Sequence, residues 1–448
     1  MRQIYPVMKH FEKIGSPQKI EERVYRLSHH VMTLSVTEGV LLYHKMTGEM
    51  LLLTSGEWGT AHADGALKSE LIKRWFLVPE DFDEYELSMK IREIAAILTP
   101  KKPGINSFTV FPTTDCNARC FYCYEKGRRR QSMDEKTALD VAAYIRRVSA
   151  GQDVQLNWFG GEPLYNSKAI DIICDELTHA GVPFTSRMIS NGYLFDEETV
   201  KKAVGQWKLH KVQIPLDGTE ETYNRAKAFI CKEGSAFKKV LGSIDLLLDA
   251  GVDVVIRMNV SRENAWDLER LAGELHERYR GEKRPGIYCV LLKEFGNKEV
   301  GCYEDAAKGV RAYERLGSRI VELGLGHIDR IRRDIPMNRC MADSDRSVTV
   351  LPDGRLGKCE HESEEKLIGS IYDDEVDAGA VSAWKERIFV PECRTCLFAP
   401  TCIKLKACAW NKDGCSEADR ELMRVVLRQS ILSEYKKQVK KQLSDDEI

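Results

Sequence analysis

The chain has 448 residues, of which 43% are hydrophobic and 30% charged, and its formal net charge is −2. This length allows two or three globular domains, and the near balance of charge predicts no general affinity for nucleic acid or membrane surfaces. Residues 1–20 lack the apolar core of a signal peptide, and no stretch approaches the roughly 18 apolar residues of a membrane span. We therefore expect a cytoplasmic protein.

The 14 cysteines are unevenly distributed along the chain. Three lie between Cys116 and Cys123, and seven lie between Cys340 and Cys415. Because cytoplasmic thiols stay reduced, clustered cysteines are expected to be metal ligands rather than disulfides. The scattered ones are expected to be small buried hydrophobic residues; they are Cys174, Cys231, Cys289 and Cys302.

Residues 1–103 are predicted to form a small α+β, winged-helix-like domain. Strand-like apolar runs at 39–43 and 50–53 are separated by a turn, and helical patterns follow at 67–75 and 81–98. The Lys-Lys-Pro-Gly sequence at 101–104 is typical of a linker.

Residues 104–330 alternate between strand-like and helical patterns. The helix at 132–148 is expected to open with a capping box at Ser132–Glu135. Six strand–helix units imply an α/β fold with a parallel sheet, arranged as a partial (β/α)6, TIM-like barrel. Active residues of such barrels lie at the carboxyl ends of the strands. The predicted strands are 108–114, 154–159, 184–190, 212–217, 252–260 and 286–292.

Residues 331–448 are predicted to be a Cys-rich domain that ends in a charged helix at about 417–443. The stretch from Pro336 to Cys415 has few apolar residues and many turn formers. A segment with so little core is expected to need bound metal for stability.

The first cysteine group has the spacing C-x3-C-x2-C, formed by Cys116, Cys120 and Cys123, directly after the first strand of the predicted barrel. Three thiolates on one loop can bind three irons of a [4Fe–4S] cluster and leave the fourth iron open to a substrate. Structural zinc is the rival, but it prefers four ligands in paired units.

This spacing resembles that of the radical S-adenosylmethionine superfamily, and further motifs match in order. Gly160–Pro163 resembles a motif that contacts the methionine amino group, with Glu162 as the carboxylate. The resemblance implies that Ser190 and Asn191 touch the ribose and that Arg257 binds the cofactor carboxylate. The full set that it places at the cofactor is Tyr122, Gly160, Gly161, Glu162, Pro163, Ser190, Asn191, Gln213, Asp217, Arg257 and Asn259.

The resemblance covers roughly residues 108–292. It implies reductive cleavage of S-adenosylmethionine to methionine and a 5′-deoxyadenosyl radical, which abstracts hydrogen from a substrate. An external electron donor such as flavodoxin or ferredoxin would then be a partner. The non-enzyme alternative is an iron–sulfur electron-transfer or sensor protein, which would need none of the cofactor motifs.

The seven distal cysteines exceed one tetrahedral site, so two metal centres are expected. They resemble a SPASM domain, which carries two auxiliary [4Fe–4S] clusters and would bring the total to three. By this resemblance, one cluster is held by Cys393, Cys396, Cys402 and Cys415, and the other by Cys340, Cys359 and Cys408. Five residues separate Cys402 from Cys408 where three are usual, which places the role of Cys408 in question. Zinc ribbons remain the alternative.

The cluster at Cys340, Cys359 and Cys408 has no fourth cysteine assigned to it. We expect an open iron there; the alternative is closure by Cys302, Cys289 or a side chain other than cysteine. Glu360 follows Cys359 directly, and some relatives place an acidic general base at that position. Glu360 can equally be a solvated acid in a Glu-rich stretch, and His361 is no better supported.

Relatives with SPASM domains mostly modify peptides or proteins. Many carry an N-terminal domain of this size that captures the leader of a ribosomally made precursor peptide by adding it to a sheet edge. The sequence thus predicts a peptide maturase that installs a thioether or a carbon–carbon crosslink. Side-chain dehydrogenation, as in anaerobic sulfatase maturation, and epimerisation are alternatives, and the N-terminal domain can instead be a scaffold.

Overall fold

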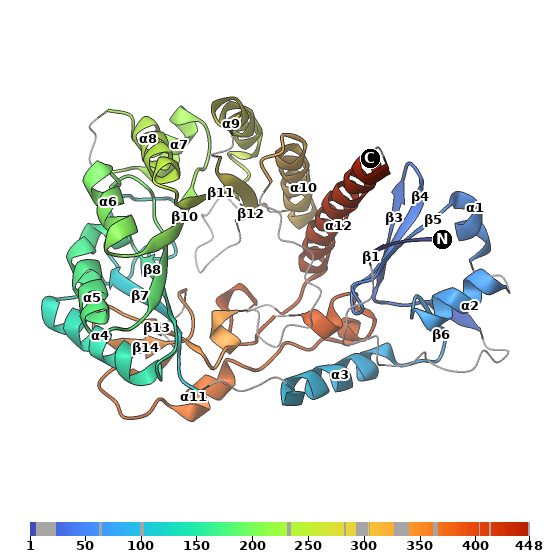
Figure 1. The fold of residues 1–448 in the computed structure, drawn as a ribbon, viewed down its shortest axis with the longest axis horizontal. Coiled ribbons are helices and arrows are strands. Elements are labelled where there is room, and N and C mark those ends of the chain that lie inside the picture. Colours follow the sequence, from blue (N-terminus) through green and yellow to red (C-terminus); the bar gives the residue numbers. More distant parts are fainter. Residues whose placement is uncertain are drawn as a thin grey trace.

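The computed structural model describes residues 1–5, 24–61, 65–98, 103–230, 234–281, 284–292, 303, 305–326, 340–361, 366–402, 404–411 and 414–446. Its largest element is a nine-stranded sheet with the order β12-β11-β10-β9-β8-β7-β13-β14-β15. Figure 1 shows the helices on the outer side of this curved sheet. The first six strands are β7 (Ser107–Thr113), β8 (Val154–Gly160), β9 (Phe184–Ile189), β10 (Leu209–Pro215), β11 (Asp253–Val260) and β12 (Gly286–Leu291).

These six strands pair in parallel, each with its neighbour in the chain. The predicted partial barrel is therefore confirmed, and the main difference is that β10 begins three residues earlier than expected, at Leu209. The helices between and after the strands are α4 (Glu135–Val148), α5 (Ser167–His179), α6 (Glu197–Gly205), α7 (Glu220–Lys227), α8 (Ala236–Asp249), α9 (Ala265–Arg278) and α10 (Ala306–Glu322), with a short 3-10 helix η1 (Pro163–Asn166).

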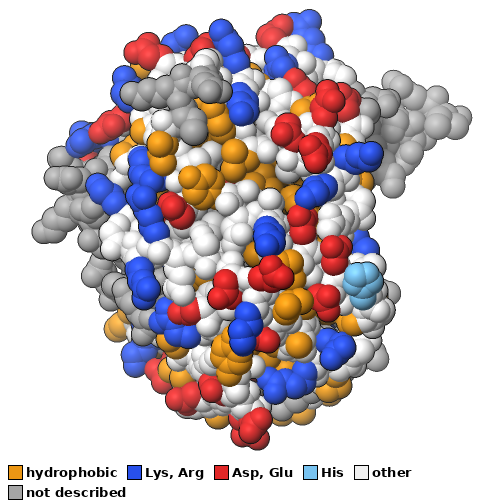
Figure 2. Space-filling model, turned by 90° about the vertical axis from the view of Figure 1, so that its left-hand side faces the viewer, with side chains coloured by type: hydrophobic (Ala, Val, Ile, Leu, Met, Phe, Trp, Pro, Cys, Tyr) orange, Lys and Arg blue, Asp and Glu red, His pale blue; other side chains and the backbone are white. Residues whose placement is uncertain are grey.

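The barrel strands have one face in the core and one face toward the barrel interior. In β9, Phe184, Ser186 and Met188 are buried, and they alternate with exposed residues such as Arg187 and Ile189. The helices cover the buried faces with apolar side chains such as Val141 and Ile145 of α4. The interior faces are left free for polar side chains. Figure 2 shows acidic and basic side chains interspersed on the outer face over α4, α5 and α6.

The predicted capping box at Ser132–Glu135 is wrong. The helix α4 begins at Glu135, and its N-cap is Asp134, whose side chain accepts a hydrogen bond from the Thr137 N–H. The Ser132 hydroxyl lies 2.8 Å from that of Thr113 instead. Tertiary contact with β7 therefore removes Ser132 from the cap position.

The Cys-rich region continues the barrel sheet. Its strand β13 (Ser347–Val350) pairs in parallel with β7, and β14 (Arg355–Gly357) and β15 (Leu367–Ser370) follow as antiparallel strands. Val348, Leu356 and Trp384 are buried in the same core as the barrel. This part of the region is thus held by ordinary packing, which differs from the expectation of a segment with little core. Its other elements are η2 (Met341–Asp343), α11 (Ala378–Ala383), η3 (Pro391–Thr395), η4 (Ala399–Thr401), η5 (Ala409–Asn411) and α12 (Glu417–Asp446).

The N-terminal region forms a four-stranded antiparallel sheet with the order β1-β5-β4-β3 and a two-stranded ribbon of β2 and β6. This agrees with the predicted α+β content, while the domain boundaries stay predictions. The elements are β1 (Arg2–Tyr5), β2 (Tyr25–Leu27), β3 (Val31–Val36), β4 (Gly39–His44), β5 (Met50–Leu53), α1 (Ser55–Thr60), α2 (Ala66–Lys73), β6 (Leu77–Pro79) and α3 (Glu84–Leu98).

One face of the N-terminal sheet packs against the end of the chain. Tyr43 and Met50 of the sheet share a hydrophobic cluster with Phe398 and with Ile431 of α12. Figure 1 shows the barrel and the N-terminal sheet at opposite ends of the molecule, with α12 and the Cys-rich segments between them. The N-terminal region is therefore part of a shared core rather than a tethered appendage. Within the described ranges, no helix is long and apolar enough to cross a membrane.

Replacement of Ile431 tests this shared core. The side chain is fully buried between α12 and the N-terminal sheet, so Ile431→Ala is expected to cost about 2–5 kcal/mol of unfolding free energy and to lower the melting temperature. Val426 on the same helix is 42% exposed, and Val426→Ala is expected to change stability by less than about 0.5 kcal/mol. Thermal unfolding followed by circular dichroism compares the two. Equal effects would mean that the cluster does not tie the two regions together.

Candidate functional site

The mouth of the barrel holds an open cavity of about 1020 Å³. It lies at the carboxyl ends of the strands, as predicted for an active site of this architecture. One side is polar and carries the first cysteine group, and the other side is aromatic. The predicted residues that line it are Cys116, Cys120, Tyr122, Cys123, Gly160, Gly161, Ser190, Asn191, Gln213, Arg257 and Asn259.

The cysteine loop is held by backbone hydrogen bonds on two sides. After β8, the Gly161 N–H donates to Thr113 O at 3.0 Å and the Glu162 N–H to Asp115 O at 2.9 Å. On the other side, the Arg119 N–H donates to Lys227 O at 2.9 Å, at the end of α7. The loop is therefore fixed by the strand ends and not only by a metal.

The two glycines allow this docking. Gly160 has φ +115°, a backbone conformation that favours glycine. A Cβ on Gly161 would lie 2.2 Å from Asp115 O, which is closer than any real contact. The two glycines therefore admit the backbone of the cysteine loop against the end of β8.

Glu162 is completely buried and does not line the cavity. Its carboxylate accepts hydrogen bonds from the Ser190 hydroxyl and the Asn191 N–H, both at 2.8 Å. The Asn191 side chain in turn donates to Asn117 Oδ1 at 2.7 Å and lies 3.8 Å from Cys116 Sγ. Burial raises the pKa of Glu162 to about 7. Glu162 thus connects β8, β9 and the cysteine loop. Pro163 follows it, also buried, as the first residue of η1.

A buried charged network forms the floor of the polar side. Lys227 Nζ lies 2.7 Å from Asp217 Oδ2 and donates to the Tyr122 hydroxyl at 2.5 Å, and Tyr122 donates to Asp217. Asn259 donates to Asp217 Oδ1 at 2.9 Å, and Arg257 Nε donates to Asn259 Oδ1 at 2.9 Å. Three predicted strand-end motifs therefore meet in one network.

Lys227 was missed by the sequence argument. It is 1% exposed and lines the cavity beside the first cysteine group. Burial opposes its charge, but the nearby Asp217 carboxylate, which also accepts a hydrogen bond from it, outweighs burial and raises its pKa. Lysine at the end of an amphipathic helix is common on surfaces, so only the tertiary position identifies this one. Lys227 and Arg257 give the cavity two fixed cations.

The aromatic side of the cavity joins the barrel to the Cys-rich region. Tyr124 and Phe159 stack with centroids 6.0 Å apart, and the His361 ring meets Tyr124 edge-on at 4.8 Å. Trp410 contacts His361 at 5.6 Å. None of these four residues was singled out as a cavity wall from the sequence, because their approach depends on how the Cys-rich region folds back.

Glu360, the predicted general base, does not line this cavity, whereas its neighbour His361 does. The Glu360 side chain is 28% exposed, and its Oε1 lies 4.0 Å from His361 Nε2. Its Oε2 is buried without a hydrogen-bond partner among the described residues. A role for Glu360 as a base remains a proposal.

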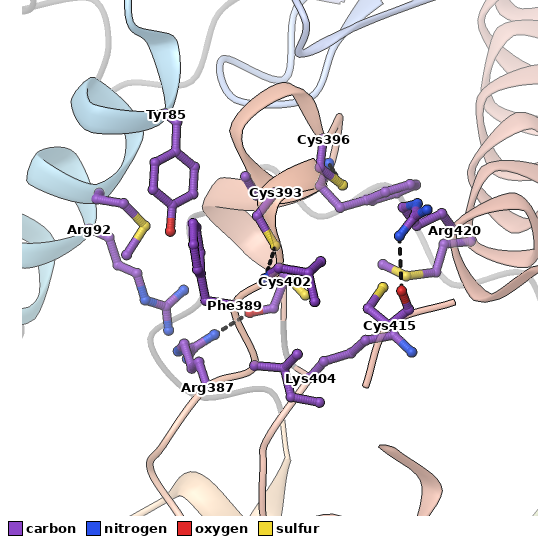
Figure 3. A pocket seen from close by; sticks show the side chains of 16 residues that line it. Tyr85, Arg92, Arg387, Phe389, Cys393, Cys396, Cys402, Lys404, Cys415 and Arg420 are labelled. Atoms are coloured by element: carbon purple, nitrogen blue, oxygen red, sulfur yellow. Dashed lines mark hydrogen bonds between the residues drawn. The ribbon is translucent and has the colours of Figure 1, made fainter. Parts of the chain in front are cut away.

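Four of the seven distal cysteines lie together. Cys393, Cys396, Cys402 and Cys415 line a second cavity of about 750 Å³ (Figure 3). The remaining three are separate from it: Cys359 is buried, and Cys340 and Cys408 are close enough to interact electrostatically. Cys289 lies on β12 and lines a third cavity, against α10 and α12, and Cys302 is outside the described residues.

A repeated backbone feature marks the clustered cysteines. In the first and second groups, the N–H two residues after the cysteine donates to its sulfur, at 3.3 Å for Cys116, 3.4 Å for Cys359 and 3.4 Å for Cys396. The same bond occurs at Cys123, Cys340 and Cys402. Such N–H groups stabilise a thiolate and tune bound iron–sulfur clusters.

The thiols of the first cysteine group lie where burial disfavours their charged form. Burial raises the pKa of the Cys116 thiol to about 12 and that of Cys123 to about 11, so a bound cation is needed to hold them as thiolates. In the described ranges, no three His, Cys, Asp or Glu side chains are grouped to hold one metal ion. A [4Fe–4S] cluster distributes its thiolates over separate irons. The scattered Cys174 and Cys289 are buried in the main core, as predicted.

Residues 110–275 match the Radical SAM superfamily. The prediction of a radical SAM enzyme is therefore confirmed, and the match implies a [4Fe–4S] cluster and S-adenosylmethionine. A GTP 3′,8-cyclase from Clostridium perfringens is 25% identical over 286 residues, which cover 59% of this chain and 84% of the cyclase.

Two solved structures share the fold. The structure of anSMEcpe with bound AdoMet and Cp18Cys peptide has a TM-score of 0.56 at 16% identity and covers 75% of this chain and 99% of its own. Streptococcus suis SuiB bound to the precursor peptide SuiA has a TM-score of 0.50 at 14% identity and covers 84% of this chain and 94% of its own. The aligned 84% of this chain is more than residues 104–448 alone can supply, so the similarity to SuiB extends into the N-terminal region.

Glu162 predicts a pH-dependent stability. A carboxylate whose pKa rises on folding stabilises the fold at low pH, and this stabilisation is lost as pH rises through about 7. Glu162→Gln removes the charge and keeps one acceptor oxygen, whereas Ser190 and Asn191 donate to two different oxygens in the wild type. The melting temperature of the variant relative to the wild type is therefore expected to rise between pH 5.5 and 8.5.

Melting curves of the metal-free proteins measure this difference. Glu135→Gln serves as the matched control, because the Glu135 side chain is 65% exposed, and its difference from the wild type is expected to stay constant over the same range. A constant difference for Glu162→Gln would mean that Glu162 is not held in the buried environment described above.

Proposed function

We propose that the protein is a radical SAM peptide maturase that installs a thioether or carbon–carbon crosslink in a ribosomally made precursor peptide. The observation that supports it most directly is the cavity where three thiols, two fixed cations and an aromatic wall meet at the strand ends. When bound, the cluster and S-adenosylmethionine supply a 5′-deoxyadenosyl radical, which abstracts hydrogen from the substrate.

In this proposal, Cys116, Cys120 and Cys123 hold the first cluster. Asn191, oriented by Glu162, is placed to contact the cofactor beside Cys116. The cofactor carboxylate is drawn to the cationic side of the cavity, where Arg257 and Lys227 are oriented by Asn259 and Asp217. Tyr122, Gly160, Gly161, Pro163, Ser190 and Gln213 complete the predicted contacts. The Gln213 side chain is oriented by the Tyr288 hydroxyl at 2.6 Å.

The distal cysteines hold two auxiliary clusters in this proposal, for a total of three. The four-cysteine cavity supplies a complete set of ligands. Cys340, Cys359 and Cys408 supply three, so an iron open to a substrate thiol stays part of the proposal. Cys289 faces a different cavity, which argues against it as the fourth ligand. The electron donor is proposed to be a flavodoxin or ferredoxin.

The substrate is proposed to be a peptide because both structural neighbours were solved with peptides, Cp18Cys and SuiA. The N-terminal sheet offers an outer strand for a leader, since β3 has a partner strand only on its β4 side among the described residues. The Lys45 N–H donates to His30 O, so alternation along the strand turns the N–H groups of Thr33 and Ser35 outward. The peptide can add there as another strand.

The first cysteine group can be tested directly. Replacement of Cys116, Cys120 and Cys123 by Ala is expected to remove about one third of the iron from anaerobically reconstituted protein, because one of three clusters loses its ligands. The release of 5′-deoxyadenosine with a strong reductant should be abolished. Cys174→Ala, a change in the core, should keep both the iron and the release. Undiminished release by the triple variant, or stoichiometric zinc in the wild type, would refute the assignment.

Leader capture can be tested without deleting a domain, since deletion would expose the core shared with α12. Thr33→Pro removes an outward N–H and is expected to reduce modification of the precursor peptide at least about tenfold, through lost local concentration. Thr33→Val keeps the N–H and should retain modification. Release of 5′-deoxyadenosine without peptide should be equal in both. Equal peptide turnover in the two variants would contradict leader capture at β3 and would favour a scaffold role for the N-terminal region.

A further inference from the structure

Helix α3 forms a wall of the four-cysteine cavity. Tyr85, Met89 and Arg92 line the cavity, and their spacing of four and three residues places them on one face of the helix. Figure 3 shows Tyr85 and Arg92 extending from this helix toward the segment that carries Cys393. In the chain, α3 comes before the barrel, whereas the four cysteines come after the barrel. A metal centre here is therefore enclosed partly by the N-terminal region.

The helix is attached to the cysteine segment by specific contacts. Asp83 lies 3.4 Å from Arg394, which follows Cys393. The Arg394 guanidinium lies over the Tyr85 ring at 5.8 Å, and Tyr85 also contacts Phe389, with ring centroids 5.6 Å apart. These contacts fix the register of α3 and hence the position of Arg92.

Arg92 brings a positive charge to the cavity. It is half-buried, and arginine stays protonated even where burial lowers its pKa, as it does here. Its charge interacts with Asp343 and with Cys402. Asp343 is also 3.5 Å from Arg387, which donates a hydrogen bond to Cys402 O. Asp343 and the two arginines thus lie beside one cysteine of the group.

The other cationic side chains that line the cavity include Lys404 and Arg420, and both have further partners. Lys404 is 3.1 Å from Asp419, and Arg420 donates to Cys415 O at 2.9 Å. A cluster becomes more negative when it is reduced, so a fixed nearby cation favours the reduced form and raises the reduction potential. The effect is strongest where water is excluded, and α3 covers this part of the cavity.

We propose that the charge of Arg92 raises the reduction potential of a cluster bound by Cys393, Cys396, Cys402 and Cys415. This inference rests on the proposed function for the presence of the cluster. It makes the N-terminal region a determinant of the redox properties of a centre more than 300 residues later in the chain.

The test is a redox titration of anaerobically reconstituted full-length protein, followed by electron paramagnetic resonance. The signal of the four-cysteine centre is identified as the one lost in Cys393→Ser. Arg92→Gln is expected to lower the midpoint potential of this centre. Arg92→Lys is expected to leave that potential close to the wild-type value, because the positive charge remains. Lys90→Gln is the matched control, since Lys90 is 63% exposed on the same helix, and should leave the potential unchanged. Iron content should be equal in these three variants.

An unchanged midpoint potential in Arg92→Gln with full iron would overturn the inference, and so would an equal decrease in Lys90→Gln. If Arg92→Gln fails to retain the cluster, Arg92→Lys decides: a wild-type potential with full iron supports the role of the charge, and loss of iron there as well overturns it. If the Cys393→Ser variant binds as much iron as the wild type, the cluster assignment in the proposed function is contradicted instead.

Discussion

The docking of the cysteine loop against the end of β8 is the constraint on which the site depends. The loop fits only because Gly160 and Gly161 present backbone where any side chain would collide with Thr113 and Asp115. The same strand end continues into Glu162, whose buried carboxylate organises Ser190 and Asn191 of the next strand. Two adjacent strand ends and the cysteine loop therefore form a single hydrogen-bonded unit that positions the loop.

Charge burial gives the site its asymmetry. Lys227 and Asp217 are each about 1% exposed, and removal of either would leave the other as an unpaired buried charge. Their cost is offset by hydrogen bonds to Tyr122 and Asn259. The result is a polar side with fixed cations and a nearby aromatic side, so that a charged cofactor and a less polar substrate group can occupy different halves of one cavity.

The three regions of the chain are joined by packing as well as by covalent linkage. The barrel sheet extends into the Cys-rich region through β13, and the N-terminal sheet shares a core with α12. The wall formed by α3 at the second cavity follows from this arrangement. In the proposed function, part of the N-terminal region therefore lies beside the four-cysteine centre.

The sequence by itself determined the local chemistry: the six barrel strands, the cysteine spacings and the strand-end motifs could all be read from it. This succeeded because strand periodicity, turn residues and ligand spacing are encoded over a few neighbouring residues. Only the tertiary structure decided that Lys227 joins Asp217, that His361 rather than Glu360 lines the cavity, and that Asp134 replaces Ser132 as the helix cap. Each of these depends on contacts between segments far apart in the chain, where burial and competing hydrogen bonds, not local pattern, select the partner.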